Sequence, residues 1–205
     1  MAASVTVIVV LGLVAYFIGN ISPSTILAKK QGFNIKEEGS GNAGTTNALR
    51  TMGKKAGIIT CVVDILKGVV AVIIGALIAD TAGACVCGLM VYLGHVWPMI
   101  YKFKGGKGVA TAFGVTLTVS PLVALISLVV TAIFVLITKR MSVGSIVGAV
   151  CMPVLVFFAA PWYTWVAIII SVIIIVKHRA NIQRLMKGEE PIMSIFEKKE
   201  KGENA

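Results

Sequence analysis

Glycine and small polar residues are concentrated in the segment GSGNAGTTNALR, residues 39–50. Three of its first six residues are glycine, which lets the backbone turn tightly and point successive N–H groups into a concavity that attracts an anion. Asn42 could cap a helix that starts near Ala43, and the positive end of that helix would strengthen the attraction. The spacing also matches the dinucleotide-binding fingerprint G-x-G-x-x-G, but a charged stretch, KKQGFNIKEE, precedes it where that fingerprint requires a strand. We therefore interpret the segment as a cradle for a different phosphate.

Side chains of the same segment could bind the phosphate directly. Ser40 and two threonines supply hydroxyl donors, and Asn47 and Arg50 would share one face of a helix. A guanidinium can hold a phosphate through two parallel hydrogen bonds. An ordinary glycine-rich connector is the plain alternative, and the density of polar residues without an acidic one argues against it. The predicted contacts of this segment are Ser40, Gly41, Asn42, Gly44, Thr45, Thr46, Asn47 and Arg50.

A second candidate segment, KFKGGKGVAT, covers residues 102–111. It resembles a P-loop only in part, because Lys107 is followed by Gly108 where that motif has serine or threonine. Gly105 and Gly106 free the backbone, and Lys107 would present its charge beside exposed N–H groups. We expect residues 105–108 to contact a substrate.

A third segment, KHRANIQRLMKGEEP, directly follows the last apolar run. If the helix continues through it, His178 and Asn181 fall on one face, with Arg184 close by. Histidine can donate to a phosphate or accept a proton near neutral pH. The basic residues of this segment could instead contact lipid headgroups.

Five other polar residues lie within or beside apolar runs. Ser142 and Ser145 start a helix at the same face, where either hydroxyl could reach a substrate or cap the helix. Asp64 and Lys67, inside an apolar run, are costly there and therefore suggest function, although we slightly favour an ion pair near the bilayer edge. His95 is interpreted as structural.

Several kinds of chemistry are not expected. The acidic and histidine residues form no metal-binding group, and no serine is matched with a histidine and an aspartate, so we expect neither a metal nor another cofactor. The four cysteines lie in apolar runs without zinc-ligand spacing. The net charge of +10 would suggest nucleic acid in a soluble protein, but no basic stretch is interleaved with aromatic residues, so no nucleic-acid partner is expected.

The composition predicts the elements that position these residues. With 57% hydrophobic and 14% charged residues and a mean hydropathy of +0.92, the chain is typical of an all-α, polytopic membrane protein. The first apolar run is interpreted as a membrane helix because it lacks the basic start and cleavage site of a signal peptide. Runs 109–138 and 141–176 are each long enough for two crossings, divided near Ser120-Pro121 and near Pro161. The expected crossings are 5–28, 56–79, 82–101, two within 109–138 and two within 141–176.

The distribution of positive charge supports seven crossings. With two crossings in 109–138, 18 of the 19 Lys and Arg residues fall on one side, which the positive-inside rule makes cytoplasmic. The N-terminus is then outside and the C-terminus inside. The first half of 109–138 is short, so a half-helix or re-entrant segment there is the alternative. Residues 1–205 are expected to form one domain, with 197–205 as a frayed tail.

The three polar segments, in this order and spacing, resemble those of the bacterial acyl-phosphate-dependent glycerol-3-phosphate acyltransferases over nearly the whole chain. The stretches DILKG and SVGSI also resemble that family. The resemblance implies an integral protein of the bacterial inner membrane with its active site on the cytoplasmic face. Its reaction would move an acyl group from acyl phosphate to the 1-hydroxyl of sn-glycerol 3-phosphate, giving lysophosphatidic acid and phosphate, in the first step of phospholipid synthesis. The H-x-x-x-x-D motif of other glycerol-phosphate acyltransferases is absent from this chain, as it is from the family.

The resemblance also assigns roles, which remain open between the two phosphates. The side chains from residues 50, 107, 178 and 181 would hold glycerol phosphate, while Ser40 and both glycine-rich backbones would hold the acyl phosphate. Either His178 or a substrate phosphate oxygen would take the hydroxyl proton, and we favour the phosphate. A monomer is expected, because one chain supplies every motif. An organic-phosphate transporter and a lipid-binding scaffold are the rival functions. The predicted catalytic residues are Ser40, Arg50, Lys107, His178 and Asn181.

Overall fold

The computed structural model describes residues 3–193 and 195–196, and every regular element within them is helical. The predicted all-α fold is therefore confirmed for the described residues. The frayed tail predicted at 197–205 lies outside them.

The first apolar run forms two helices, α1 (Val5–Gly19) and α2 (Pro23–Lys30). α1 ends where Asn20 donates from its backbone and its side chain to the Tyr16 carbonyl. Pro23 then starts α2, since proline lacks an N–H but suits the first turn of a helix. The expected single helix over 5–28 is thus interrupted, although Val5–Lys30 together remains long and apolar enough for one span.

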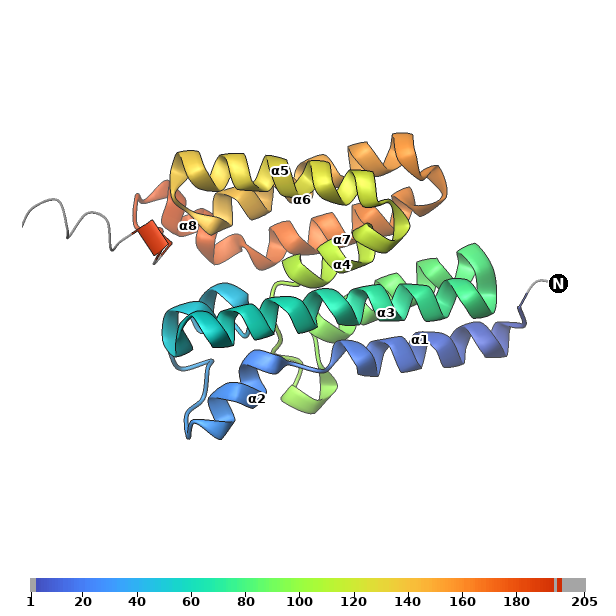
Figure 1. The fold of residues 1–205 in the computed structure, drawn as a ribbon, viewed down its shortest axis with the longest axis horizontal. Coiled ribbons are helices and arrows are strands. Elements are labelled where there is room, and N and C mark those ends of the chain that lie inside the picture. Colours follow the sequence, from blue (N-terminus) through green and yellow to red (C-terminus); the bar gives the residue numbers. More distant parts are fainter. Residues whose placement is uncertain (1–2, 194, 197–205) are drawn as a thin grey trace, which may run out of the picture.

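α3 (Thr45–Val96) contains the next two expected crossings as the arms of a hairpin. Its backbone leaves helical geometry at Ala79 and Asp80, and the chain doubles back there (Figure 1). The arms approach closely beside this turn, since a side chain at Gly75 would collide with the backbone of Gly83. A further non-helical residue, Gly53, separates a short first segment of α3 from the long arm.

The remaining apolar runs divide where the sequence predicts. Ser120 accepts from the backbone of Val123 and so caps the helix that Pro121 begins. Ala160 and Pro161 interrupt the last run, where Pro161 begins a new helical turn without a side-chain cap. The elements are η1 (Met99–Tyr101), α4 (Val109–Val119), α5 (Pro121–Thr138), α6 (Met141–Ala159), η2 (Pro161–Tyr163), α7 (Thr164–Lys177) and α8 (Arg179–Met186).

Four stretches of the described chain are long and apolar enough to cross a membrane, and the bent pair Pro161–Lys177 and Arg179–Met186 would make a fifth. One of the four, Thr45–Tyr101, includes the α3 hairpin. α4 has 11 residues, or a length of roughly 16 Å at 1.5 Å per residue, about half of the hydrocarbon core. Its length suits the half-helix that the sequence analysis gave as the alternative to a full crossing in the first half of 109–138.

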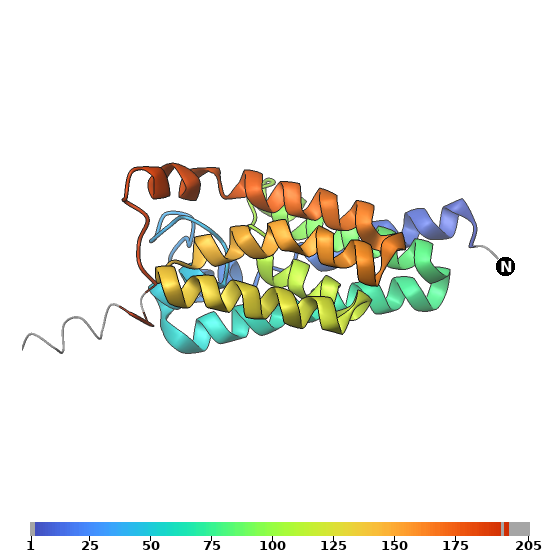
Figure 2. The ribbon, with the colours of Figure 1, turned by 90° about the horizontal axis from the view of Figure 1, so that it is seen from above.

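The long helices run roughly side by side in an elongated bundle (Figures 1 and 2). The connections at 31–44 and 139–140 and helix α8 lie toward one end of it, and the described N-terminal residues lie at the other. The turns at 79–80, 120 and 160 lie toward the N-terminal end. Three clusters of basic residues, at 29–55, 139–140 and 177–187, therefore gather toward one end. The basic loop at 102–107 folds against the end of α3.

Glycines allow α4 to pack directly on α3. A side chain at Gly68 of α3 would lie 2.6 Å from the Thr111 carbonyl and 2.9 Å from the Val115 nitrogen. On α4, Gly114 faces the backbone of Ile65 in the same way. Because both contacts are with backbone atoms, neither position has room for a side chain. The contact fixes the position of α4 and therefore where the preceding loop ends.

We expect Gly68→Leu to destabilise the protein, because the added side chain must push α4 away from α3. Overpacking typically costs about 1–3 kcal/mol, and for a chain of this size we expect thermal unfolding in detergent to start several degrees lower. Ala76→Leu is the matched control, since it adds a similar volume to an exposed position of the same helix arm. Equal melting temperatures for the two variants would contradict the close contact.

Candidate anion-binding site

The loop before α3 is held in shape by the buried side chain of Asn47. Its Oδ1 accepts from the Ser40 backbone N–H at 2.9 Å, and its Nδ2 donates to the Glu38 carbonyl at 2.9 Å and the Ile35 carbonyl at 3.2 Å. Both oxygen and nitrogen are thus engaged within the loop. Asn47, which the sequence suggested as a substrate contact, therefore organises the loop from beneath.

Glycine is required in this loop for conformational reasons. Gly39 and Gly41 have φ values of 59° and 68°, in the left-handed region that other residues rarely adopt. α3 begins at Thr45 with Gly44 as its N-cap and without a side-chain cap. The prediction that Asn42 caps a helix starting near Ala43 is therefore wrong. The helix begins later, and the Asn42 amide lies against Gly44.

The polar side chains around the start of α3 remain largely accessible. Ser40 is exposed, and Thr46 and Arg50 are half-buried in the first turns of the helix. Among the described residues, Arg50 makes no hydrogen bond or ion pair. The Thr45 hydroxyl is buried without a hydrogen-bond partner in the described part of the chain.

The second loop folds back onto the end of α3 and touches the first loop. The backbone N–H groups of Gly105 and Gly106 donate to the carbonyls of Val96 and His95 at 3.3 and 3.2 Å. A side chain at Gly106 would meet both the His95 ring and, at 2.8 Å, the Ala43 carbonyl. The two glycine-rich loops therefore pack together at Gly106, as a common anion site requires.

Lys107 extends from this loop to the third segment. Its ammonium donates to Oδ1 of Asn181, and the Asn181 Nδ2 donates to Glu190 Oε1 at 2.6 Å. Arg184 Nε donates to the other Glu190 oxygen at 2.8 Å. Lysine, amide, carboxylate and guanidinium thus form one connected polar cluster, and Asn181 and Glu190 within it are buried.

The third segment is bent at His178 and is not the straight continuation that the sequence suggested. α7 and α8 meet there at 52°. His178 is buried, and its Nδ1 lies 2.8 Å from the Ile174 carbonyl. A carbonyl can only accept, so Nδ1 carries the proton, and Nε2 of the neutral ring remains an acceptor. The bend still leaves His178 close enough to Lys107 for their charges to interact.

Burial shifts the pKa of both basic groups in this cluster. Desolvation lowers the pKa of Lys107 to about 8, against the opposing influence of the Glu190 carboxylate. Desolvation, with the nearby Lys107 ammonium, lowers the pKa of His178 to about 4. At neutral pH the site therefore holds a charged lysine and a neutral histidine.

Glu190 is a site residue that the sequence analysis missed. A glutamate beyond the end of a helix usually remains in solvent, but Glu190 is 7% exposed. The hydrogen bonds from Asn181 and Arg184 and the neighbouring Ser142 hydroxyl keep the pKa of its carboxyl below the ordinary value, against the effect of burial. Its backbone carbonyl also accepts from Arg140 Nε at 2.9 Å. The signal available in the sequence was a glutamate that closely follows a helix carrying basic residues.

The structure brings the predicted residues together unequally. Lys107, His178, Asn181 and Ser142 belong to one cluster, while the Ser145 hydroxyl donates to the Met141 carbonyl of its own helix at 2.9 Å. In the part of the chain that the structure describes, the segment from Ser40 to Arg50 meets the second loop where the Ala43 carbonyl approaches Gly106. The described residues contain no group of three or more His, Cys, Asp or Glu side chains that could hold a metal ion.

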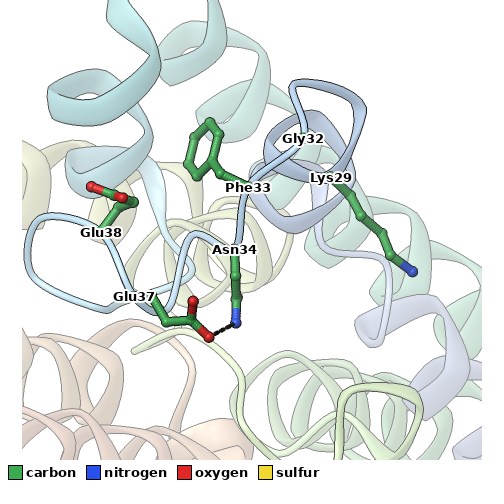
Figure 3. Close-up of a pocket in the computed structure, with 6 residues that line it drawn as sticks. All are labelled: Lys29, Gly32, Phe33, Asn34, Glu37 and Glu38. Carbon is green, nitrogen blue, oxygen red and sulfur yellow. Dashed lines mark hydrogen bonds between the residues drawn. The ribbon is translucent and has the colours of Figure 1, made fainter.

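A surface hollow is lined by residues that do not belong to this cluster. It has a volume of about 560 Å³ and is formed by the end of α2 and the following loop (Figure 3). Two glutamates face it, and one of them, Glu37, accepts from the Asn34 amide at 2.7 Å. Its acidic lining disfavours a phosphate. The residues around it are Lys29, Gly32, Phe33, Asn34, Glu37 and Glu38.

Known proteins resemble the chain over nearly its whole length. The family model "Glycerol-3-phosphate acyltransferase" matches residues 9–188. A glycerol-3-phosphate acyltransferase of Clostridioides difficile is 43% identical over 203 residues, covering 94% of this chain and 97% of the relative.

Two crystal structures of PlsY, an integral membrane glycerol 3-phosphate acyltransferase, share the fold. The glycerol 3-phosphate form has a TM-score of 0.88 at 36% identity and covers 93% of this chain and 98% of its own. The lysophosphatidic acid form has a TM-score of 0.84 at 37% identity and covers 91% and 95%. With the family model matching most of the chain and the polar cluster in place, this chain belongs to the glycerol-3-phosphate acyltransferase family.

Proposed function

We propose that this protein transfers a fatty acyl group from acyl phosphate to the 1-hydroxyl of sn-glycerol 3-phosphate, giving lysophosphatidic acid and inorganic phosphate. Acylation of glycerol 3-phosphate follows from the family, and the donor is the proposal. The Lys107–Asn181–Glu190–Arg184 cluster beside His178 carries the proposal, because such an array of wholly or partly buried hydrogen-bond donors suits a phosphate. The PlsY forms named for glycerol 3-phosphate and lysophosphatidic acid support the same substrate and product.

Glycerol 3-phosphate is assigned to this cluster. Its phosphate would accept from Lys107, Asn181 and Arg184, the donors around the Glu190 carboxylate. A dianionic phosphate and a carboxylate use the same donors, and the phosphate carries more charge. Binding therefore requires the Glu190 carboxylate to share its donors with the phosphate or give them up. Arg50, half-buried in α3, would complete the contacts from the first loop.

Acyl phosphate is assigned to the two glycine-rich loops. The Ser40 hydroxyl and the N–H groups in the first turn of α3, at the positive end of that helix, would hold its phosphate and the oxyanion that develops on its carbonyl. The substrate hydroxyl oxygen bonds to the acyl carbon, the bond from that carbon to the phosphate oxygen breaks, and phosphate leaves. An acyl phosphate is already activated, so positioning and charge stabilisation suffice without a covalent enzyme intermediate.

A substrate phosphate oxygen is the proposed proton acceptor. His178 presents an acceptor nitrogen, but a pKa of about 4 makes it a poor base at neutral pH, where effective general bases have pKa values near the working pH. Its neutral Nε2 is better suited to accept a hydrogen bond from a glycerol hydroxyl. We therefore assign His178 to orienting glycerol 3-phosphate.

The protein is proposed to form seven membrane segments, with the N-terminus outside and the C-terminus in the cytoplasm of a bacterial cell. The two arms of α3 supply two segments, α4 supplies a half-length one, and α1, α5, α6 and α7 supply the rest. The shared end of three basic clusters supports the orientation through the positive-inside rule. The active site would then face the cytoplasm at the inner membrane, beside the lipid that supplies and receives acyl chains, in a single-domain monomer.

An acyl-donor assay is expected to separate this activity from that of a transporter or a lipid-binding scaffold. Purified protein with palmitoyl phosphate and labelled glycerol 3-phosphate should yield lysophosphatidic acid and an equal amount of phosphate. A transporter or scaffold yields neither. Palmitoyl-CoA in place of palmitoyl phosphate should give no product, and product from the CoA ester at a comparable rate would overturn the proposed donor.

Replacing His178 with glutamine should raise KM for glycerol 3-phosphate and leave kcat within about tenfold of the wild type. Glutamine keeps a polar group near the position of Nε2 but cannot act as a base at neutral pH. Loss of a general base costs about 10²–10⁴ in rate. Steady-state kinetics with both substrates decide the matter. A loss of that size confined to kcat would assign the proton to His178.

The dependence of kcat/KM for glycerol 3-phosphate on pH should follow the Lys107 ammonium. Its pKa of about 8 means that the charge is present below that value and lost above it. The substrate phosphate is fully ionised above pH 7, since its second pKa is about 6, so a decline between pH 8 and pH 9.5 reports the protein. We expect about a tenfold loss per pH unit at the upper end.

Lys107→Arg is the control for this profile. Arginine stays protonated throughout the range, so the variant should be slower but show a flat profile to pH 9.5. A flat wild-type profile over the same range would show that Lys107 is not the titrating group.

A further inference from the structure

Three buried polar residues of α3 form a network that the proposed catalytic steps do not use. Asp64, Lys67 and His95 are 2%, 4% and 5% exposed. The Lys67 ammonium lies 2.7 Å from Asp64 Oδ1 and 2.7 Å from His95 Nδ1, and it donates to the Ile21 carbonyl at 2.7 Å. Ionisable groups within membrane segments are costly and are usually retained for a function.

The ammonium joins three separate parts of the fold. Ile21 lies in the break between α1 and α2, Asp64 lies in the first long arm of α3, and His95 lies near the end of the second arm. The ammonium makes hydrogen bonds with the Ile21 carbonyl and His95 Nδ1 and forms an ion pair with the Asp64 carboxylate. Loss of Lys67 would therefore release the α1–α2 break and His95 together, and would leave the Asp64 carboxylate buried without a cation.

The contact with Lys67 fixes the tautomer of His95. His95 Nδ1 lies 2.7 Å from the Lys67 ammonium and 3.4 Å from Asp64 Oδ1. Because an ammonium can only donate, we assign Nδ1 as the acceptor of its shorter contact, which places the proton of the neutral ring on Nε2. The Nε2 edge faces Gly106, where even a methyl group would collide with it. The same point lies 2.8 Å from the Ala43 carbonyl, so His95 presents an N–H donor where the two glycine-rich loops meet.

His95 also holds the second loop through its backbone. Its carbonyl accepts from the Gly106 N–H at 3.2 Å, next to the residue that binds Asn181. Ring and carbonyl of a single residue therefore contact Gly106 on two sides. The position of Lys107 in the anion cluster depends on this support.

We infer that Lys67 and His95 are positioning residues for the acyl transfer. Lys67 fixes the Nε2–H tautomer of His95, and His95 sets the distance between the loop at 39–44 and the loop at 105–108. Neither residue touches the reacting atoms. This inference rests on the proposed function, because it concerns the loops assigned to the two substrates. A misplacement of about 1 Å in such a site can cost about 100-fold in rate.

The double variant Asp64→Asn/Lys67→Met tests this role without leaving a buried charge unpaired. Both side chains keep nearly their size, so we expect a folded, monodisperse protein with a melting temperature close to that of the wild type. We expect kcat/KM for glycerol 3-phosphate to fall at least tenfold and the Kd from calorimetric titration with glycerol 3-phosphate to rise. Lys54→Met, the same change at an exposed position of α3, should leave both values unchanged. A folded double variant with wild-type kinetics and affinity would reduce the network to a structural ion pair.

A comparison of His95→Gln with His95→Asn keeps the test open if the double variant fails to fold. Glutamine can place an amide N–H near the position of Nε2, whereas asparagine ends near Nδ1 and retains only the contact with Lys67. The inference requires kcat/KM of His95→Gln to exceed that of His95→Asn at similar melting temperatures. Equal values, or the opposite order, would overturn it. The wild-type assay tests the proposed function separately, because absence of lysophosphatidic acid there would contradict that function. The binding titrations with glycerol 3-phosphate would still compare the variants and so test the inference.

Discussion

The hydrogen bond from the Lys107 ammonium to Asn181 joins the two parts of this molecule. Helices α1 and α4 pack chiefly on α3, while α5, α6 and α7 pack chiefly in sequence on one another. Lys107 precedes α4 and Asn181 lies in α8, so their bond connects the first group to the last helix. Partial burial strengthens the need for this bond, because a partly desolvated ammonium without an acceptor is more costly than a paired one. The geometry of the anion site therefore depends on how both groups of helices are assembled.

Local signals accounted for the helices and most of their ends. Prolines at 121 and 161 divided the long apolar runs as expected. Proline destabilises the interior of a helix but suits its first turn, and this effect depends on the local backbone alone. The same signal at Pro23 was overlooked within a run that seemed continuous by hydropathy alone. Hydropathy measures the preference of a segment for lipid and does not show where the backbone bends within it. The proposed number and orientation of the crossings follow from the distribution of positive charge.

The sequence predicted which segments form the site better than it predicted the role of each residue within them. Glycines and cations near the membrane edge identified the segments, since few other functions need that combination. The roles of Asn47 and Glu190 depend on contacts with segments distant in the fold or beyond the helix, and sequence spacing does not encode them. Asn47 serves its own loop, and Glu190 enters the cluster because Gly188, at a φ of 75°, turns the chain back after α8. Such returns are decided by packing and not by local propensity.

The charges of the cluster explain how a cationic site can be folded before its substrate arrives. Lys107 and Arg184 are cations, His178 is neutral, and Glu190 supplies one negative charge among them. The carboxylate therefore satisfies donors that would otherwise be buried unpaired, while one positive charge remains in excess. A dianionic phosphate neutralises more of the site than a carboxylate does, and its own binding energy must offset the loss of the hydrogen bonds to Glu190. The same glutamate thus supports folding and sets the minimum charge that a competing ligand must bring.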